Sequence, residues 1–352
     1  MKHQFELTEP SDLLDKKGLL LHPGWARQPL WHYDRGAIRA NALQIKEWDY
    51  YYVLSDDLKK GITFTISDLG YAGLMAVCWL DFEKNTFKQA DTIAPLTLGR
   101  ITRGLGEGTL GSDAGILEFK NKDMNLRFET GSGKRILSFE LAQMDIPGEG
   151  TGLSGTLTLT QPEGMESMNI ATSWKENRKR FYYNRKINCM PASGTVKAGS
   201  NSFNFNPDRA SGGLDWGRGA WTYQNRWYWS SASGYLEGKP FGFNLGYGFS
   251  DRTPASENLL FFEHRAHKLD EVLFDFDPED YTKPWTFTSS DGRLDLNFKP
   301  LFDRSSQVNL LLIKSVQHQV FGRFSGRVRL DDGRELILND FLGFAEDVYN
   351  RW

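Results

Sequence analysis

Hydrophobic and polar residues alternate along much of the chain with a period of two. The pattern is clear at residues 62–66, 156–160 and 293–298, where apolar side chains are separated by polar ones. Because successive side chains of a β-strand point to opposite faces, this alternation predicts half-buried strands. Near the C-terminus, Asp332-Gly333 stands between two such stretches, which is typical of a hairpin turn. The pattern therefore predicts an all-β protein of antiparallel strands.

Helical periodicity is confined to two short segments. Residues 11–17 predict one short helix, and residues 342–352 predict a second. In the second segment, Phe344, Val348 and Trp352 fall at helical spacing, which is typical of an amphipathic helix. We expect this segment to dock on the C-terminal half of the protein and to close one end of it.

The length of the chain and an internal similarity favour two domains. A chain of 352 residues is long for a single core. Residues 153–159 and 324–330 both begin with an apolar residue and Ser-Gly and then alternate, although two strands can share such a start by coincidence. The pattern is interrupted at residues 161–177, which include Pro162 and Gly164. We therefore expect two β-barrel domains, 1–168 and 169–352.

Composition and charge exclude several classes of protein. With 42 basic and 45 acidic residues the formal net charge is −3, so we expect no nucleic-acid partner. The only cysteines, Cys78 and Cys189, offer neither a disulfide framework nor a zinc signature. The apolar run at residues 19–21 is too short for a signal peptide or an integral membrane segment. We expect a cytoplasmic protein, and the sequence does not predict its oligomeric state.

The densest cluster of chemically capable residues spans 212–229. It combines glycines, Asp215 and Arg218 with six large aromatic residues between Trp216 and Trp229. An acid among aromatic rings is poorly hydrated, so Asp215 can hold a proton unless Arg218 neutralises it. One interpretation is a pocket wall with an acid, and the other is a buried Asp–Arg pair that pins a barrel corner. The candidate catalytic residues are Asp215 and Arg218, and the candidate ligand-binding residues are Trp25, Trp216, Trp221, Tyr223, Trp227 and Trp229.

Other motifs carry weaker signals. His264 and His267 are three residues apart in a segment that follows an apolar strand pattern, where such positions face opposite sides, so no metal site is expected. Residues 106–111 match G-x-G-x-x-G, but no strand–helix context surrounds them, so no dinucleotide cofactor is expected. The basic residues between 178 and 186 are interpreted as a solvated strand flank rather than an anion site.

Four segments of the chain resemble the DUF2804 family of uncharacterised proteins. They are Asp215-Trp216-Gly217-Arg218-Gly219-Ala220-Trp221, Gly24-Trp25-Ala26, the segment 46–52 and the C-terminal residues 342–352. These segments span nearly the whole chain. The family is in turn remotely similar to the tandem-lipocalin group of carotenoid hydratases, tocopherol cyclases and AttH-like proteins. This resemblance implies two tandem lipocalin-like antiparallel β-barrels with few short helices.

The resemblance also implies a lipophilic small-molecule ligand of isoprenoid or fatty-acyl type. Enzymes of the wider group protonate a carbon–carbon double bond, a role that Asp215 would take here without a cofactor. No second acid stands near it in the sequence, and residues 243–245 offer only the amide of Asn244. We expect acid-assisted hydration, dehydration, cyclisation or isomerisation. The alternatives are a non-catalytic lipid carrier or sensor, and a structural protein with filled barrels.

Overall fold

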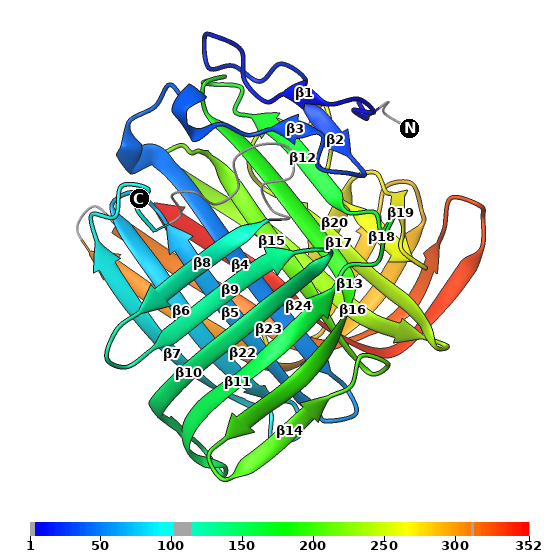
Figure 1. The fold of residues 1–352 in the computed structure, drawn as a ribbon. Helices are drawn as coiled ribbons and strands as arrows, with labels where there is room; N and C mark the ends of the chain where they lie inside the picture. The colour runs from blue at the N-terminus through cyan, green and yellow to red at the C-terminus, as the bar shows by residue number, and fades with distance from the viewer. Residues whose placement is uncertain (1–3, 102–113, 311–312, 352) are drawn as a thin grey trace.

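The computed structural model describes residues 4–101, 114–310 and 313–351 and consists almost entirely of β-strands. The only helical turns in these ranges are two three-residue 3-10 helices, η1 (Arg35–Ala37) and η2 (Ala42–Gln44). Two large curved antiparallel sheets make up most of the molecule (Figure 1). The prediction of an all-β, barrel-like architecture is therefore confirmed. No helix in the described ranges is long and apolar enough to cross a membrane.

The first sheet has thirteen strands from the N-terminal two-thirds of the chain. They are β2 (Gly24–Ala26), β4 (Ile45–Ser55), β5 (Lys60–Asp68), β6 (Ala72–Asp81), β7 (Thr86–Pro95), β8 (Gly115–Lys120), β9 (Asn125–Gly131), β10 (Lys134–Ile146), β11 (Gly150–Thr160), β12 (Met168–Ser173), β13 (Phe181–Ala198), β14 (Asn201–Phe205) and β15 (Ala210–Ala220). The main order is β7-β6-β5-β4-β15-β13-β11-β10-β9-β8, while β12 and β14 also pair with β13, and β2 pairs with β12. The strand β15 thus lies in the middle of this sheet.

The second sheet has nine strands from the C-terminal part of the chain. They are β16 (Gln224–Leu236), β17 (Lys239–Tyr247), β18 (Leu259–Phe262), β19 (Arg265–Lys268), β20 (Val272–Asp275), β21 (Trp285–Ser289), β22 (Leu294–Leu310), β23 (Ile313–Arg329) and β24 (Glu335–Arg351). Their order is β19-β18-β17-β16-β24-β23-β22-β21-β20. The last strand of the chain is therefore the central strand of its sheet.

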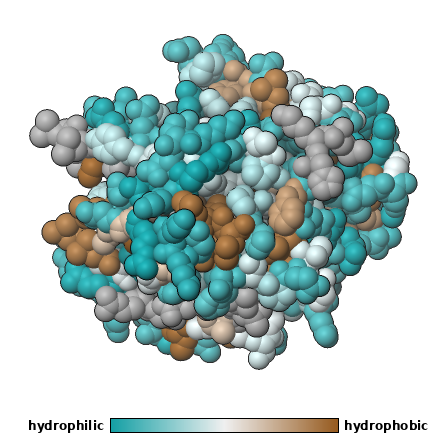
Figure 2. Space-filling view, turned by 90° about the horizontal axis from the view of Figure 1, so that it is seen from above, coloured by the Kyte–Doolittle hydropathy of each residue, from teal (hydrophilic) through white to brown (hydrophobic). Residues whose placement is uncertain are grey.

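The N-terminal segment covers one end of both sheets. A small parallel sheet pairs β1 (Ser11–Asp12) with β3 (Trp31–His32), and both lie with β2 at the top of the molecule in Figure 1. Gln4 accepts a hydrogen bond from the backbone N–H of Ser256 and donates to the carbonyl of Leu269, so the segment is fastened to the second sheet. Figure 2 looks down on this end, where apolar side chains reach the surface in separate patches among hydrophilic ones.

Apolar side chains form three buried clusters, and the third lies between the two sheets. The first belongs mostly to the first sheet and its N-terminal cover, and the second lies within the second sheet. The intersheet cluster combines Tyr50, Tyr52, Leu54, Cys78, Leu80 and Phe82 with Trp229, Phe302, Phe321, Leu342 and Phe344. Burial of this much apolar area on both sides holds the sheets face to face.

Polar side chains also cross from one sheet to the other. The amide of Asn188 on β13 donates to Ser231 Oγ (2.8 Å) and to the carbonyl of Phe243 (2.9 Å). The hydroxyl groups of Tyr52 and Ser233 are 2.7 Å apart. Each of these groups is buried and has a partner, as a dry interface requires. These hydrogen bonds fix the relative position of the two sheets.

The chain passes from the first sheet to the second between β15 and β16. Residues 161–177, where we expect a domain boundary, lie within the first sheet, because β12 and β13 pair with β2 and β15. Whether the halves 1–168 and 169–352 behave as separate folding units remains a prediction. The sheets themselves divide the chain near residues 221–223.

Both predicted helices are wrong. Residues 11–17 contain β1, an isolated bridge from Leu14 to Leu20 and turns, and residues 342–351 belong to β24. Phe344 and Val348 are four positions apart, a spacing that also places two side chains on one face of a strand. Hydrogen bonds from β16 on one side and β23 on the other hold this segment extended. Trp352 and the glycine-rich residues 106–111 lie outside the described residues.

Candidate functional site

The aromatic-rich motif lies on β15, and strand geometry divides it between two faces. Trp216 and Arg218 point into the first sheet's own core, where the Trp216 ring makes edge contacts with Tyr33 and Tyr183. Asp215 points the other way, toward the second sheet, because residues three apart on a strand face opposite sides. Asp215 and Arg218 therefore do not form the pair that the sequence suggested as one alternative.

Arg218 is fully buried and joins β15 to β4. Its Nη2 atom is 2.9 Å from Asp49 Oδ1, and its Nη1 atom donates to the Trp48 carbonyl at 2.7 Å. The guanidinium also lies over the Trp216 ring, 4.2 Å from the centroid. Burial raises the pKa of Asp49, and the Arg218 charge opposes that shift. Arg218 therefore acts as an internal tie between strands.

Asp215 is held by two polar side chains of the neighbouring strand β13. Asn184 Nδ2 donates to Oδ1 at 2.6 Å, and Lys186 Nζ donates to Oδ2 at 2.9 Å. The same ammonium lies 3.7 Å from the centroid of the Trp229 ring and 3.9 Å from Glu257 Oε2. Asp215 is thus part of a charged network that reaches across to the second sheet.

The second sheet contributes two further acids to this network. Glu257 follows β17, and burial raises the pKa of its carboxyl group. Glu346 lies on β24 opposite Trp229, and burial raises its pKa to about 7. Gln319 on β23 donates a hydrogen bond to Glu346 Oε1. We call these residues the intersheet polar cluster: Asn184, Lys186, Asp215, Glu257, Gln319 and Glu346.

Two glycines flank Asp215 and leave room for aromatic side chains of β4. A Cβ atom on Gly213 would lie 2.4 Å from Tyr52 Cζ, and one on Gly217 would lie 2.1 Å from Trp48 Cζ2. No real Cβ atom tolerates such contacts, so only glycine allows these rings to cover the strand. The glycines of the motif thus bring the Trp48 and Tyr52 rings close to β15 on either side of Asp215.

Replacing Gly217 with alanine tests this close approach. We expect Gly217→Ala to lower the free energy of unfolding by about 1–3 kcal/mol, because the Trp48 ring must move within a packed interface. Urea unfolding followed by tryptophan fluorescence measures the change. Gly131→Ala is the matched control, since nothing lies within 4 Å of a Cβ at that strand position. Equal stabilities of the two variants would contradict the proposed role of Gly217.

The predicted ligand-binding aromatic residues do not form one wall. Trp216 lies in the first core, and Trp25 lies on β2 near Arg27 and Lys268. Tyr223 is 51% exposed, and Trp229 belongs to the intersheet region. Only Trp221 and Trp227 pack directly against each other, with ring centroids 5.9 Å apart. Trp221 is the centre of an aromatic cluster that comprises Trp48, Trp174, Tyr182, Trp221, Trp227 and Phe249.

A surface pocket of about 460 Å³ opens beside this aromatic cluster. Trp174 and Phe249 belong to both the pocket lining and the cluster. Three arginines lie in or beside the pocket, each with an acidic partner: Arg226 with Asp347, Arg252 with Glu271, and Arg178 with Asp251. The pocket is therefore lined mainly by polar and charged side chains whose charges are balanced, and Trp174 and Phe249 are its aromatic residues.

A larger concavity of about 670 Å³ lies elsewhere, on the outer polar face of β8–β11 and β13. Its lining includes Lys120, Arg127 and Glu140 and none of the predicted site residues. The outward-facing side chains of these strands are hydrophilic, as expected for the solvated face of an antiparallel sheet. This concavity has no link to the aromatic cluster or the buried acids.

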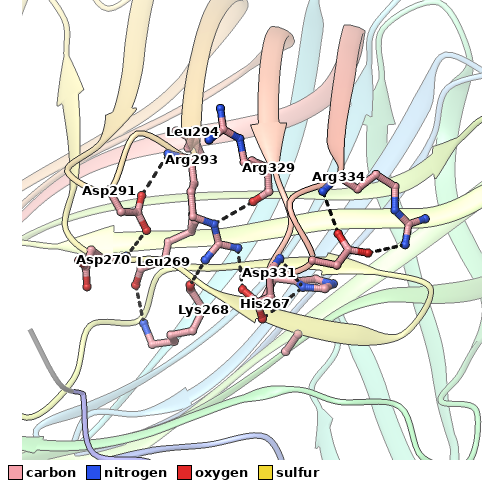
Figure 3. Close-up of polar contacts among 12 residues, drawn as sticks. His267, Lys268, Leu269, Asp270, Asp291, Arg293, Leu294, Arg329, Asp331 and Arg334 are labelled. Carbon is pink, nitrogen blue, oxygen red and sulfur yellow. Dashed lines mark hydrogen bonds and ion pairs between the residues drawn. The ribbon is translucent and has the colours of Figure 1, made fainter. Parts of the chain in front are cut away.

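In the histidine segment 263–267, His267 makes a polar contact with an acidic side chain. His267 on β19 lies beside Asp331, with Nδ1 3.3 Å from Oδ2, and Arg293 holds the same carboxylate at 2.7 Å (Figure 3). Lys268 turns inward and donates to the Leu269 carbonyl. Within the described ranges, no three His, Cys, Asp or Glu side chains are arranged to hold a metal ion.

Of the six members of the intersheet polar cluster, only Asp215 was identified as a site residue from the sequence. Lys186, Glu257 and Glu346 are far from Asp215 along the chain, and no local motif links them. Lys186 pairs with Asp215 across the β13–β15 ladder, while Glu346 pairs with Trp229 across the β16–β24 ladder. Strand register could have indicated the ladder neighbours, but the contact of Glu257 with Lys186 depends on how the sheets pack.

The fold and the site define a two-sheet β protein with charged side chains buried between the sheets. The chain belongs to the DUF2804 family, a domain of unknown function, whose model matches residues 4–352. The resemblance found in the sequence is thereby confirmed. No curated protein sequence matches the chain significantly.

Solved structures with similar folds share little sequence with the chain. An AttH-type protein from Nitrosomonas europaea has a TM-score of 0.50 at 13% identity, covering 90% of this chain and 95% of that one. CghA, solved with Sch210972, has a TM-score of 0.52 at 10% identity, covering 88% and 89%. Kievitone hydratase from Nectria haematococca has a TM-score of 0.49 at 11% identity, covering 91% and 92%. At these low identities, the AttH-type protein and CghA show only that they share a fold with this chain.

Proposed function

We propose that the protein binds an uncharged, lipophilic small molecule of isoprenoid or fatty-acyl type and acts on one of its carbon–carbon double bonds by acid-assisted chemistry. The aromatic cluster supplies the binding surface, and the intersheet polar cluster supplies the chemistry. The observation that carries the proposal is that three carboxyl groups are buried next to aromatic rings between two sheets. Aromatic walls with a few placed polar groups are typical of small-molecule sites.

Strand β13 connects the two parts of the proposed site. Tyr182, in the aromatic cluster, and Asn184 and Lys186, in the polar cluster, alternate along one face of it. A strand rises about 3.3 Å per residue, so these positions span roughly 13 Å. Burial and the charges of Glu257 and Asp215 raise the pKa of Tyr182, which is consistent with this proximity.

In this proposal Asp215 supplies a carboxylate that faces the ligand space, next to Lys186. Arg218 acts from behind the strand as a positioning residue, because it ties β15 to Asp49 of β4. The balanced charges at the pocket rim favour an uncharged ligand. The similar fold of CghA, which is solved with Sch210972, supports small-molecule binding by analogy.

Purification from the natural host followed by native mass spectrometry tests the binding proposal. We expect a co-purified lipophilic molecule, and we expect Phe249→Ala and Trp221→Phe to reduce its occupancy, since both remove aromatic surface from the cluster. Leu273→Ala, which truncates an apolar side chain that is 59% exposed on β20, is the control. If wild-type protein carries no such molecule and does not bind the fluorescent polyene cis-parinaric acid, the binding proposal fails.

A non-catalytic carrier would use the same pocket and the same aromatic residues. The variant Asp215→Asn distinguishes the carrier from the enzyme, because it preserves the shape of the side chain but removes its charge. A carrier keeps its ligand chemically unchanged in both proteins. An enzyme converts the co-purified ligand on incubation, and the conversion falls when Asp215→Asn removes the carboxylate that holds Lys186 in the intersheet polar cluster. Chromatography of the extracted ligand before and after incubation separates the two functions.

A further inference from the structure

The intersheet polar cluster contains three acids and one cation, Lys186. Lys186 Nζ is 2.9 Å from Asp215 Oδ2 and 3.9 Å from Glu257 Oε2, so two carboxyl groups share one ammonium. Glu346 is the third acid, and all three side chains are nearly buried. An unpaired carboxylate in such a place is costly, and buried acids usually bind a proton instead. The cluster therefore favours one protonated carboxyl group.

Glu346 is the carboxyl group with the weakest cationic support. Among the described residues, no Lys, Arg or His nitrogen forms an ion pair with it, whereas Asp215 and Glu257 both lie within 4 Å of Lys186. Within the described part of the chain, its one hydrogen-bond partner is the neutral amide of Gln319. Trp229, which pairs with it across the ladder, and Phe344, two residues before it, belong to the apolar intersheet cluster. These surroundings favour the neutral form of Glu346.

Gln319 has a defined orientation, which fixes the role of one oxygen of Glu346. Its Oε1 atom accepts a hydrogen bond from Arg304, so its amide nitrogen must point the other way. That nitrogen donates to Glu346 Oε1 and, at 3.0 Å, to the Tyr50 hydroxyl oxygen. Oε1 of Glu346 is thus held as an acceptor, so a proton on this carboxyl group would reside on Oε2.

The charged and titratable groups that face Glu346 come from both sheets. Asp215 and Lys186 lie on the first sheet with Tyr50, and Arg304 lies on β22 beyond Gln319. Burial is the largest cause of the raised pKa of Glu346, and the Asp215 charge raises it further. Lys186, the Gln319 hydrogen bond and Arg304 act in the opposite direction. Glu257, whose pKa is also raised by burial, is the competing site for the proton.

Building on the proposed function, we propose that Glu346 is the proton donor of the intersheet polar cluster, and that its substrate is an uncharged alkene. The π electrons of the double bond form a new C–H bond with the Glu346 proton, and the O–H electron pair stays on the carboxylate. The adjacent carbon becomes electron-deficient. Loss of a proton from its other neighbouring carbon to Glu346 completes an isomerisation, while addition of water and return of the water proton completes a hydration.

Infrared spectroscopy of the protein without added ligand tests the protonation directly. We expect wild-type protein at pH 6 to show the carbonyl stretch of a protonated carboxyl group, and Glu346→Gln to lack it. Glu335→Gln, at an exposed end of the same strand, is the matched control and should retain the band. A band that survives in Glu346→Gln but disappears in Glu257→Gln would place the proton on Glu257 and overturn the proposal, and so would the absence of the band in wild-type protein.

Stability as a function of pH gives a second readout. An acid whose pKa is raised by folding binds its proton more tightly in the folded chain, so stability falls as the pH rises from its ordinary pKa of 4.5 to about 7. We expect the melting temperature of Glu346→Gln, relative to wild type, to increase across this window and to level off above it. A constant difference would contradict the proposal. Neither experiment needs a ligand, so failure here is distinguishable from failure to find a bound lipid.

Discussion

Removal of residues 342–352 is expected to abolish the folded second sheet. The segment is most of β24, which lies between β16 and β23 and provides hydrogen bonds to both. Phe344 is fully buried between the two sheets, and truncating one such side chain typically costs about 3–5 kcal/mol. Losing several buried side chains together with two ladders exceeds the roughly 5–15 kcal/mol that stabilises a typical protein. Circular dichroism and a thermal scan should show lost strand content and no cooperative transition for this sheet.

Two single substitutions on β24 give reference values for the effect of the deletion on stability. Phe344→Ala should lower the free energy of unfolding by about 3–5 kcal/mol while leaving a folded protein. Ile337→Thr, at a position that is 61% exposed, should change it by less than about 0.5 kcal/mol. A deletion variant that melts like the wild type would show that β24 does not organise the sheet.

The prediction of a helix at the C-terminus failed because β24 is buried on both faces. Phe344 and Val348 face the same side, but the residue between them on that face is the acid Glu346, which interrupts the apolar alternation. On the opposite face Ala345 and Asp347 are also buried. A strand covered on both sides need not keep the period-two pattern that marks half-buried strands. Strand β5 is also almost entirely buried on both faces, but one face carries Thr63 and Thr65, so the alternation persists and residues 62–66 were predicted correctly as strand.

The candidate site was predictable in part. Asp215 was singled out from the sequence, and the structure places it among buried polar groups. Strand alternation alone separates Asp215 from Arg218, so the assignment of β-structure already argued against their pairing. Lys186, Glu257 and Glu346 come from three other strands or loops, and their proximity depends on how the two sheets pack. No spacing within the chain encodes that packing.

The partner of Asp215 is testable through stability. Asp215→Asn leaves the buried Lys186 ammonium with only Glu257 at 3.9 Å, so we expect a loss of about 3–5 kcal/mol in the free energy of unfolding. Lys186→Met in the same protein removes the uncompensated charge and should restore part of the loss. Chemical denaturation of the single and double variants measures both effects, and near-ultraviolet circular dichroism checks that the fold is retained.

Arg218→Met tests whether Asp215 belongs with Lys186 or with the Arg218–Asp49 pair on the other face of β15. If Asp215 depended on Arg218, adding Arg218→Met to Asp215→Asn would restore stability. Because Arg218 pairs with Asp49 instead, the double variant should lose a further 3–5 kcal/mol or so, as two independent buried ion pairs are broken on opposite faces of one strand. If Arg218→Met restores stability, or if Lys186→Met does not, then the assignment of Asp215 to the intersheet polar cluster is wrong. The expected pattern leaves Asp215 as the charge partner of Lys186, and Glu346 as the carboxyl group free to give up a proton.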